Sequence, residues 1–356
     1  MKTYRVAMLL CMLVLNAGAN ADTNLNNLNL PAPYVSPARP LTGTIRIWGH
    51  GAFGGTDDFI ESLTRAWEEG FRRYHPGVQF ETRLTGTAAA IGALYTGVGD
   101  LALMGREIWP NEVAAFQEVY HYPPTGIDIV TGSFDVRNRG YAIVLFVQQN
   151  NPLRQLTLAQ VDAVFSAAHR RGAASARTWG DLGLGGTWQH KPIHPYGLSI
   201  ARGFAEYFED AVFESSRIWN PDLREFADQP GSKGGATDGG QQLLDALADD
   251  PQGIGYSGLL YHNPRVRPLA IALNDAGPYV LPTQETVLNH SYPLTRKIAF
   301  FLNRPPGQPV DPKLKEFLRY VLSRKGQQAV LSEGRGYLPM LAPLAVSELE
   351  KLEDPQ

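Results

Sequence analysis

Apolar and polar residues alternate along the first third of the chain in a pattern that predicts three successive strands, each ending in a turn of small residues. The first two turns open helices, and the third strand delivers Gly105 and Arg106 at its end. Because the carboxyl ends of parallel strands lie at one edge of a sheet, we expect the three turns to border a common ligand crevice. The strands are expected at residues 44–48, 78–84 and 100–104.

Two later runs, 141–148 and 297–303, are apolar without interruption, which is typical of strands buried on both faces. We interpret them as crossings between two lobes. The prediction is therefore a two-lobed α/β fold of the type II periplasmic-binding-protein kind, each lobe a mostly parallel sheet flanked by helices, with a cleft that closes about a hinge. The expected boundaries are 43–143 plus 300–345 for lobe I, 144–299 for lobe II and 346–356 for a charged tail.

The amino terminus indicates export. Lys2 and Arg5 precede an apolar run that is shorter than the roughly 20 residues of a membrane span, and an A-x-A cleavage pattern ends at Ala21. We expect residues 1–21 to be removed as a signal peptide, which makes the protein periplasmic or secreted. Residues 22–42 are rich in Asn and Pro and are expected to form a flexible leader.

Composition and charge exclude several classes of function. The formal net charge is −3, and loss of the signal would make it more negative, which argues against a nucleic-acid surface. The single cysteine, Cys11, lies within the signal, so we expect no disulfide and no thiol chemistry after cleavage. His190 and His194 have a metal-ligand spacing only on a helix, which Pro192 would break, so no metal site is expected.

The glycine-containing turns favour an anion, because a helix N-terminus presents free N–H groups and a partial positive charge. Gly49, Gly51 and Gly54 also match a dinucleotide fingerprint, but export argues against a soluble nicotinamide cofactor, so no cofactor is expected. Arg106 has two interpretations. It either faces the crevice or forms a surface salt bridge with Glu107 or Glu112.

A series of short runs, taken in order, resembles the periplasmic phosphate-binding proteins of ABC importers, which have the type II solute-binding fold. The runs cover most of residues 43–341. They include Thr85-Gly86-Thr87, Asp100 to Arg106, Leu156-Thr157, Trp179 to Leu182, Ser199 to Gly203, Gly253-Ile254-Gly255-Tyr256, Tyr292-Pro293-Leu294 and Gly336-Tyr337-Leu338-Pro339.

The resemblance implies an oxyanion that is held from both lobes by hydroxyls, backbone N–H groups and an arginine. Carried over by position, the expected ligand residues are Thr87, Arg106 and Ser199, backbone donors at Ala52, Phe53 and Ala88, and Thr56 and Arg202 as further candidates. The chain departs from the family pattern in both lobes. In the first turn, Ala52 and Phe53 stand where a small residue and a hydroxyl are expected, and the Thr56 hydroxyl could compensate if the turn is longer. Pro195 stands where many members have an arginine, and Ile200 and Ala201 stand where Gly and Thr would follow the serine.

The resemblance also implies a function. The chain is expected to be a non-enzymatic binding protein, acting as a monomer, that captures a small oxyanion, with phosphate as the expected ligand. It would deliver that anion to the membrane subunits of an ABC importer. The alternative is a member of the family that has lost tight anion transport and acts as a sensory or protein-interaction module.

Overall fold

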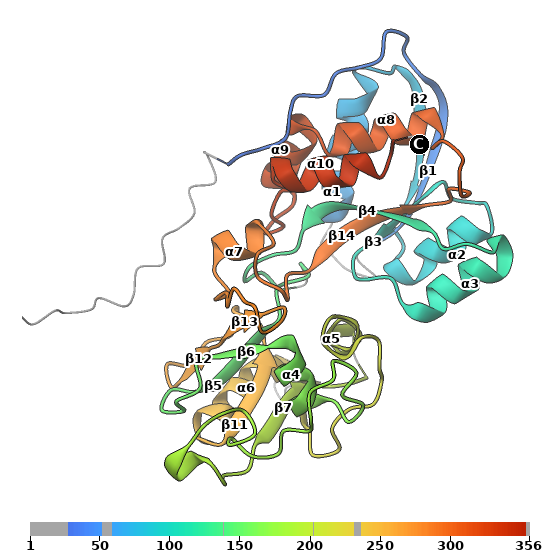
Figure 1. The fold of residues 1–356 in the computed structure, drawn as a ribbon. Coiled ribbons are helices and arrows are strands. Elements are labelled where there is room, and N and C mark those ends of the chain that lie inside the picture. Colours follow the sequence, from blue (N-terminus) through green and yellow to red (C-terminus); the bar gives the residue numbers. More distant parts are fainter. Residues whose placement is uncertain (1–27, 52–58, 138, 202, 231–235, 354–356) are drawn as a thin grey trace, which may run out of the picture.

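Two separate five-stranded sheets, each with its own apolar core, organise the chain into two lobes (Figure 1). The computed structural model describes residues 28–51, 59–137, 139–201, 203–230 and 236–353. Among these residues, every helix is too short or too polar to span a bilayer. The predicted two-lobed α/β fold is confirmed.

Lobe I contains a sheet of order β2-β1-β3-β14-β4, in which β1 pairs in parallel with β2 and β3, and β14 runs antiparallel to both of its neighbours. Its strands are β1 Thr42–Gly49, β2 Gly77–Arg83, β3 Leu101–Met104, β4 Thr125–Thr131 and β14 Lys297–Leu302. Its helices are α1 Phe59–Arg72, α2 Ala90–Tyr95, α3 Pro110–Tyr120, α8 Pro312–Val321, α9 Arg324–Glu333 and α10 Ala342–Glu350. Helices α1 and α8–α10 lie on one side of the sheet and α2 and α3 on the other (Figure 1).

Lobe II contains a sheet of order β12-β5-β11-β7-β8, in which β11, β7 and β8 are parallel and β5 is antiparallel to β11. The strands of this sheet are β5 Val144–Gln148, β7 His194–Leu198, β8 Arg224–Phe226, β11 Gly253–Ser257 and β12 Val266–Pro268. Two small pairs accompany it, β6 Gln155–Thr157 with β13 Ala270–Ala272, and β9 Gln229–Pro230 with β10 Ala236–Thr237. The helices are α4 Leu158–Phe165, α5 Gly203–Phe213, α6 Gly239–Ala248 and α7 Gln284–Leu288.

The two apolar strands that we expected to cross between the lobes do not cross. The chain passes from one lobe to the other just before each of them. Strand β5 lies wholly in the lobe II sheet and β14 wholly in the lobe I sheet, so the described residues that link the lobes are 132–137 and 139–143 before β5 and 289–296 before β14. The uninterrupted apolar character of these strands therefore reflects burial on both faces of a sheet. The second segment of lobe I begins at Lys297, rather than at the expected residue 300.

The described part of the leader, residues 28–41, packs against lobe I, which differs from the expected flexible segment. The Tyr34 hydroxyl donates to Glu316 Oε2 at 2.8 Å and pairs with His75 Nε2 at 2.7 Å, and its ring packs edge-on against Tyr74 and Tyr320. The expected tail also differs, because helix α10 extends through its first residues and Leu352 is fully buried. In both cases, a few apolar residues in a polar segment carry the packing.

Replacing Tyr34 by phenylalanine is expected to lower the free energy of unfolding by about 1–2 kcal/mol, because the change deletes both hydrogen bonds of a buried hydroxyl. Urea unfolding followed by circular dichroism measures this loss. The matched control is Tyr279→Phe, since the Tyr279 side chain is 36% exposed. Equal stability of the Tyr34→Phe protein and the wild type would show that these two hydrogen bonds contribute nothing to the stability of lobe I.

Candidate functional site

The ends of β1, β2 and β3 meet at one edge of the lobe I sheet, as the strand pattern predicts. His50 N–H, just after β1, donates to the Leu103 carbonyl at 2.8 Å, and Gly86 N–H donates to the Gly49 carbonyl at 2.9 Å. Gly49 has φ +140°, and a Cβ there would lie 2.1 Å from the Leu103 carbonyl oxygen. Only glycine therefore allows the first turn to approach the third strand this closely.

Thr87 and Ala88 lie in the second turn, where a short 3-10 helix from Thr87 to Ala89 leads into α2. The Thr87 Oγ1 atom accepts a hydrogen bond from Gly105 N–H at 3.3 Å, so it joins the second turn to the third. Accepting this bond leaves the hydroxyl proton of Thr87 available to a ligand. Ala88 is exposed at the helix start.

Four of the expected site residues cannot be placed. Ala52, Phe53 and Thr56 in the first turn, and Arg202 before α5, lie outside the described residues. The site is therefore built from the second and third turns of lobe I and from the start of α5 in lobe II.

Arg106 forms a salt bridge with Glu112, and its side chain is 14% exposed. Its Nη1 and Nη2 atoms donate to the two Glu112 carboxylate oxygens at 2.9 and 2.8 Å, and its guanidinium lies 3.4 Å from the Trp109 ring centroid. Nη1 also donates to the Glu107 carbonyl at 2.8 Å. Most of the hydrogen-bonding capacity of Arg106 is thus committed to the loop that begins α3.

Ser199 follows β7 and precedes α5, at the carboxyl edge of the lobe II sheet. Its N–H donates to the Phe226 carbonyl at 2.9 Å, and the next N–H, that of Ile200, donates to Glu225 Oε2 at 2.9 Å. A carboxylate from β8 therefore occupies one of the backbone donors that would face an anion.

Sequence reasoning missed a cluster beside the first turn, formed by His50, Phe59, Arg139 and Tyr337. The Arg139 guanidinium lies 3.4 Å from the Phe59 ring centroid, and Tyr337 Oη lies 3.3 Å from His50 Nε2. Burial, and then the charge of Arg139, lowers the pKa of His50 to about 4. A neutral imidazole and a cation therefore border this edge. Only the presence of Tyr337 in a family run hinted at the cluster.

A second missed group joins the lobes at the base of α5. Arg296, in the linking segment before β14, forms a bidentate ion pair with Glu107, and its guanidinium also lies 5.0 Å from the Phe204 ring and 5.1 Å from the Tyr207 ring. Glu107 follows β3 in lobe I, whereas Phe204 and Tyr207 belong to α5 in lobe II. Arg296 therefore contacts both lobes.

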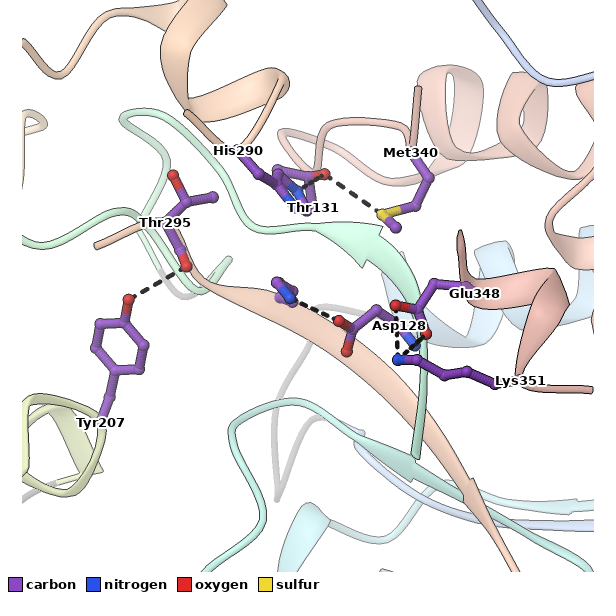
Figure 2. Close-up of polar contacts among 9 residues, drawn as sticks. Asp128, Thr131, Tyr207, His290, Thr295, Met340, Glu348 and Lys351 are labelled. Carbon is purple, nitrogen blue, oxygen red and sulfur yellow. Dashed lines mark hydrogen bonds and ion pairs between the residues drawn. The ribbon is translucent and has the colours of Figure 1, made fainter. Parts of the chain in front are cut away.

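The hinge between the lobes is held by further polar contacts, shown in Figure 2. The Thr131 hydroxyl at the end of β4 pairs with His290 Nε2 at 2.8 Å, and the Tyr207 hydroxyl donates to the Thr295 carbonyl at 3.2 Å. Within the lobe I sheet, Asp128 of β4 accepts an ion-pair hydrogen bond from Lys297 of β14 at 2.8 Å. The first two contacts tie the loop after α7 to the lobe I sheet and α5 to the linking segment before β14.

A cavity of about 670 Å³ lies elsewhere, at the amino-terminal end of β7, and is lined in part by His194, Tyr196 and Arg224. Because parallel sheets bind ligands at their carboxyl ends, where Ser199 lies, we do not assign this cavity to the site. Within the described ranges, no group of three His, Cys, Asp or Glu side chains is placed to hold a metal ion.

Comparisons with known proteins identify the family of this chain. A family model described as a PBP superfamily domain matches residues 37–325. The phosphate-binding protein PstS of Pseudomonas aeruginosa is 31% identical over 338 residues, covering 94% of this chain and 95% of that protein. PstS of Staphylococcus epidermidis is 22% identical and covers 83% of this chain and 79% of that protein.

Among solved structures, PstS from Borrelia burgdorferi matches with a TM-score of 0.53 and 13% identity, covering 83% of this chain and 98% of that one. At this identity the match supports the fold alone. It agrees with the arrangement of two helix-flanked sheets described above.

Proposed function

We propose that this chain, which belongs to the PBP superfamily and within it to the PstS phosphate-binding proteins, is an exported receptor that captures inorganic phosphate between its lobes for ABC-type uptake. The observation that carries the proposal is the convergence of three strand ends at Thr87 and Gly105, on the side of lobe I that contacts α5 through Arg296. Hydroxyls and helix starts at such an edge suit an oxyanion.

The proposed ligand set combines hydroxyls and backbone donors from both lobes. Thr87 would donate a hydroxyl from lobe I and Ser199 one from lobe II, with N–H groups of Ala52, Phe53 and Ala88 and the Thr56 hydroxyl completing the shell. Closure of the lobes would remove the anion from water and strengthen each of these hydrogen bonds. The chain itself would perform no chemistry on the ligand.

The membrane subunits of an ABC importer would receive the closed, loaded form, and the protein would act as a monomer in the periplasm or outside the cell after cleavage near Ala21. Relatives named as phosphate-binding proteins support phosphate as the ligand.

Titrating the purified protein with inorganic phosphate by calorimetry tests the function. A dissociation constant near or below 1 μM, which corresponds to about −8 kcal/mol, is expected for a transport receptor. Absence of heat at millimolar phosphate would refute uptake as the function.

Glu225 favours a second candidate function, a sensory or protein-interaction module without tight anion transport. Its carboxylate accepts from Ile200 N–H at the place where an anion would bind, and would repel a second negative charge. If this second function is correct, Glu225→Gln should raise the affinity for phosphate. If the chain is a tight phosphate receptor, the same substitution should change that affinity little.

Arg106→Ala is expected to weaken phosphate binding by less than tenfold, because the guanidinium is already paired with Glu112. The position-based expectation is the opposite, a complete loss of binding. Calorimetry on the variant separates the two, and a loss of more than 100-fold would restore Arg106 to the ligand set. Thermal unfolding of the variant is the control, because Arg106→Ala leaves the Glu112 carboxylate without its ion-pair partner and could lower the stability of the fold.

A further inference from the structure

Arg296 is one of the most buried charged residues of the chain, and it lies where the two lobes meet. The residue is 6% exposed. Its guanidinium is held by Glu107 from lobe I and lies against the rings of Phe204 and Tyr207 from lobe II. These contacts fix the orientation of the guanidinium and depend on how the two lobes are placed relative to each other.

The ion pair with Glu107 uses only one side of the guanidinium. Nε donates to Glu107 Oε1 at 3.1 Å and Nη2 donates to Oε2 at 2.7 Å. A guanidinium carries five N–H donors, arranged so that a second parallel pair points from Nη1 and Nη2. Among the residues that the structure describes, these two bonds to Glu107 are the side-chain hydrogen bonds that Arg296 makes.

The second pair of N–H donors, on Nη1 and Nη2, can bind a further acceptor. An oxyanion matches the paired N–H groups of arginine in a bidentate arrangement. The unoccupied side of Arg296 therefore has the donor geometry that phosphate binds.

The surroundings of Arg296 connect it to both halves of the proposed site. Glu107 directly follows Arg106 in the third turn of lobe I, and Phe204 lies in the first turn of α5, the helix that Ser199 precedes. Burial disfavours the charged form of Arg296, but the Glu107 carboxylate more than offsets this, so the pKa lies above its ordinary value. Arg296 is therefore a permanent cation.

We infer that Arg296 is the arginine that holds the oxyanion in the closed cleft, through Nη1 and Nη2. It supplies the charge that the family pattern places at position 195, where this chain has Pro195. Glu107 is the positioning residue, since it fixes the guanidinium before the ligand arrives and so lowers the entropy cost of binding. This inference rests on the proposed function.

The test compares Arg296→Gln with a matched control, Arg46→Gln, by calorimetric titration with inorganic phosphate. Arg46 makes the same bidentate ion pair, with Asp100 at 3.1 and 2.7 Å, but it lies in β1 on the partly exposed side of lobe I. We expect Arg296→Gln to weaken binding at least 100-fold and Arg46→Gln to change it less than twofold. Circular dichroism establishes that both variants are folded.

A measurement on the wild-type protein covers the case in which Arg296→Gln does not fold. In nitrogen-15 spectra of the arginine side chains, added phosphate should shift the Arg296 Nη signals and slow their hydrogen exchange, and should leave those of Arg46 unchanged. If folded Arg296→Gln binds within threefold of the wild type, or if phosphate leaves the Arg296 signals unmoved while it binds, the inference is overturned and the uptake function stands. If the wild type binds no phosphate, both are overturned.

Discussion

Replacing Tyr256 by alanine is expected to destabilise lobe II by about 3–5 kcal/mol, because the change removes a large aromatic side chain from a fully packed core. Tyr256 is fully buried, and its ring stacks on Phe208 with centroids 4.2 Å apart and meets Phe165 edge-on at 5.7 Å. The cavity left behind cannot collapse easily, since rings pack on both of its sides.

Tyr256 also holds the strand that precedes Ser199. Its hydroxyl donates to the Leu198 carbonyl at 3.1 Å, and a Cβ at Gly197 would lie 2.7 Å from its ring. Tyr256→Phe keeps the packing and deletes this hydrogen bond alone, so a loss of only about 1–1.5 kcal/mol is expected.

Chemical denaturation followed by circular dichroism and by tryptophan fluorescence measures both losses. Trp179, Trp188 and Trp219 report on lobe II. Tyr279→Ala is the control, because Tyr279 is 36% exposed. If Tyr256→Ala cost no more than this control, the aromatic cluster would not be the core of lobe II.

Acidification from pH 7 to pH 4 is expected to destabilise the protein through two histidines that are held neutral. Burial is the main cause that lowers the pKa of both His50 and His290 to about 4; the charge of Arg139 adds to the shift of His50, and that of Lys297 to the shift of His290. His290 pairs with Thr131 at the hinge, where Met340 also contacts the Thr131 hydroxyl (Figure 2).

The direction of the effect follows from proton binding. In the unfolded chain these imidazoles titrate near 6.5, so between pH 6.5 and about 4 the unfolded state binds more protons than the folded state. The stability is complete above pH 6.5, falls as the pH drops through this window and loses nothing further below it. Both residues keep some solvent contact, so each is expected to contribute roughly 2–3 kcal/mol to the loss.

His290→Gln isolates one of the two contributions. Glutamine does not titrate, so the variant should lose roughly 2–3 kcal/mol less stability than the wild type between pH 7 and pH 4. The exposed His190 serves as the control position, with His190→Gln expected to follow the wild-type curve. A pH dependence of His290→Gln that coincides with the wild type would contradict the assignment.

Part of the candidate site could be predicted from local sequence. The strand periods around residues 44–48, 78–84 and 100–104 locate three turns, and Thr87 and Gly105 are indeed joined by a hydrogen bond. In lobe II, the strand and helix patterns around Ser199 likewise place this residue between β7 and α5, where the structure has it.

Other parts could not be predicted, because they depend on partners far away in the sequence. Nothing near Arg296 indicates that it pairs with Glu107, almost two hundred residues earlier, or that rings of α5 cover it. Arg106 had two interpretations, and the choice between them depends on how the loop before α3 folds back on it. The leader shows the same limit, since Tyr34 binds His75 and Glu316.

The sequence by itself determined the classes of element, the two lobes and the carboxyl edge of the sheet at which we propose that the ligand binds, because hydrophobic period and glycine turns are local properties of the backbone. The tertiary structure decided which charged groups are paired. It joined Arg106 to Glu112, Ile200 N–H to Glu225 and Arg296 to Glu107. An ion pair depends on the distance between two side chains in space, and only the packing of the two sheets and their helices sets that distance.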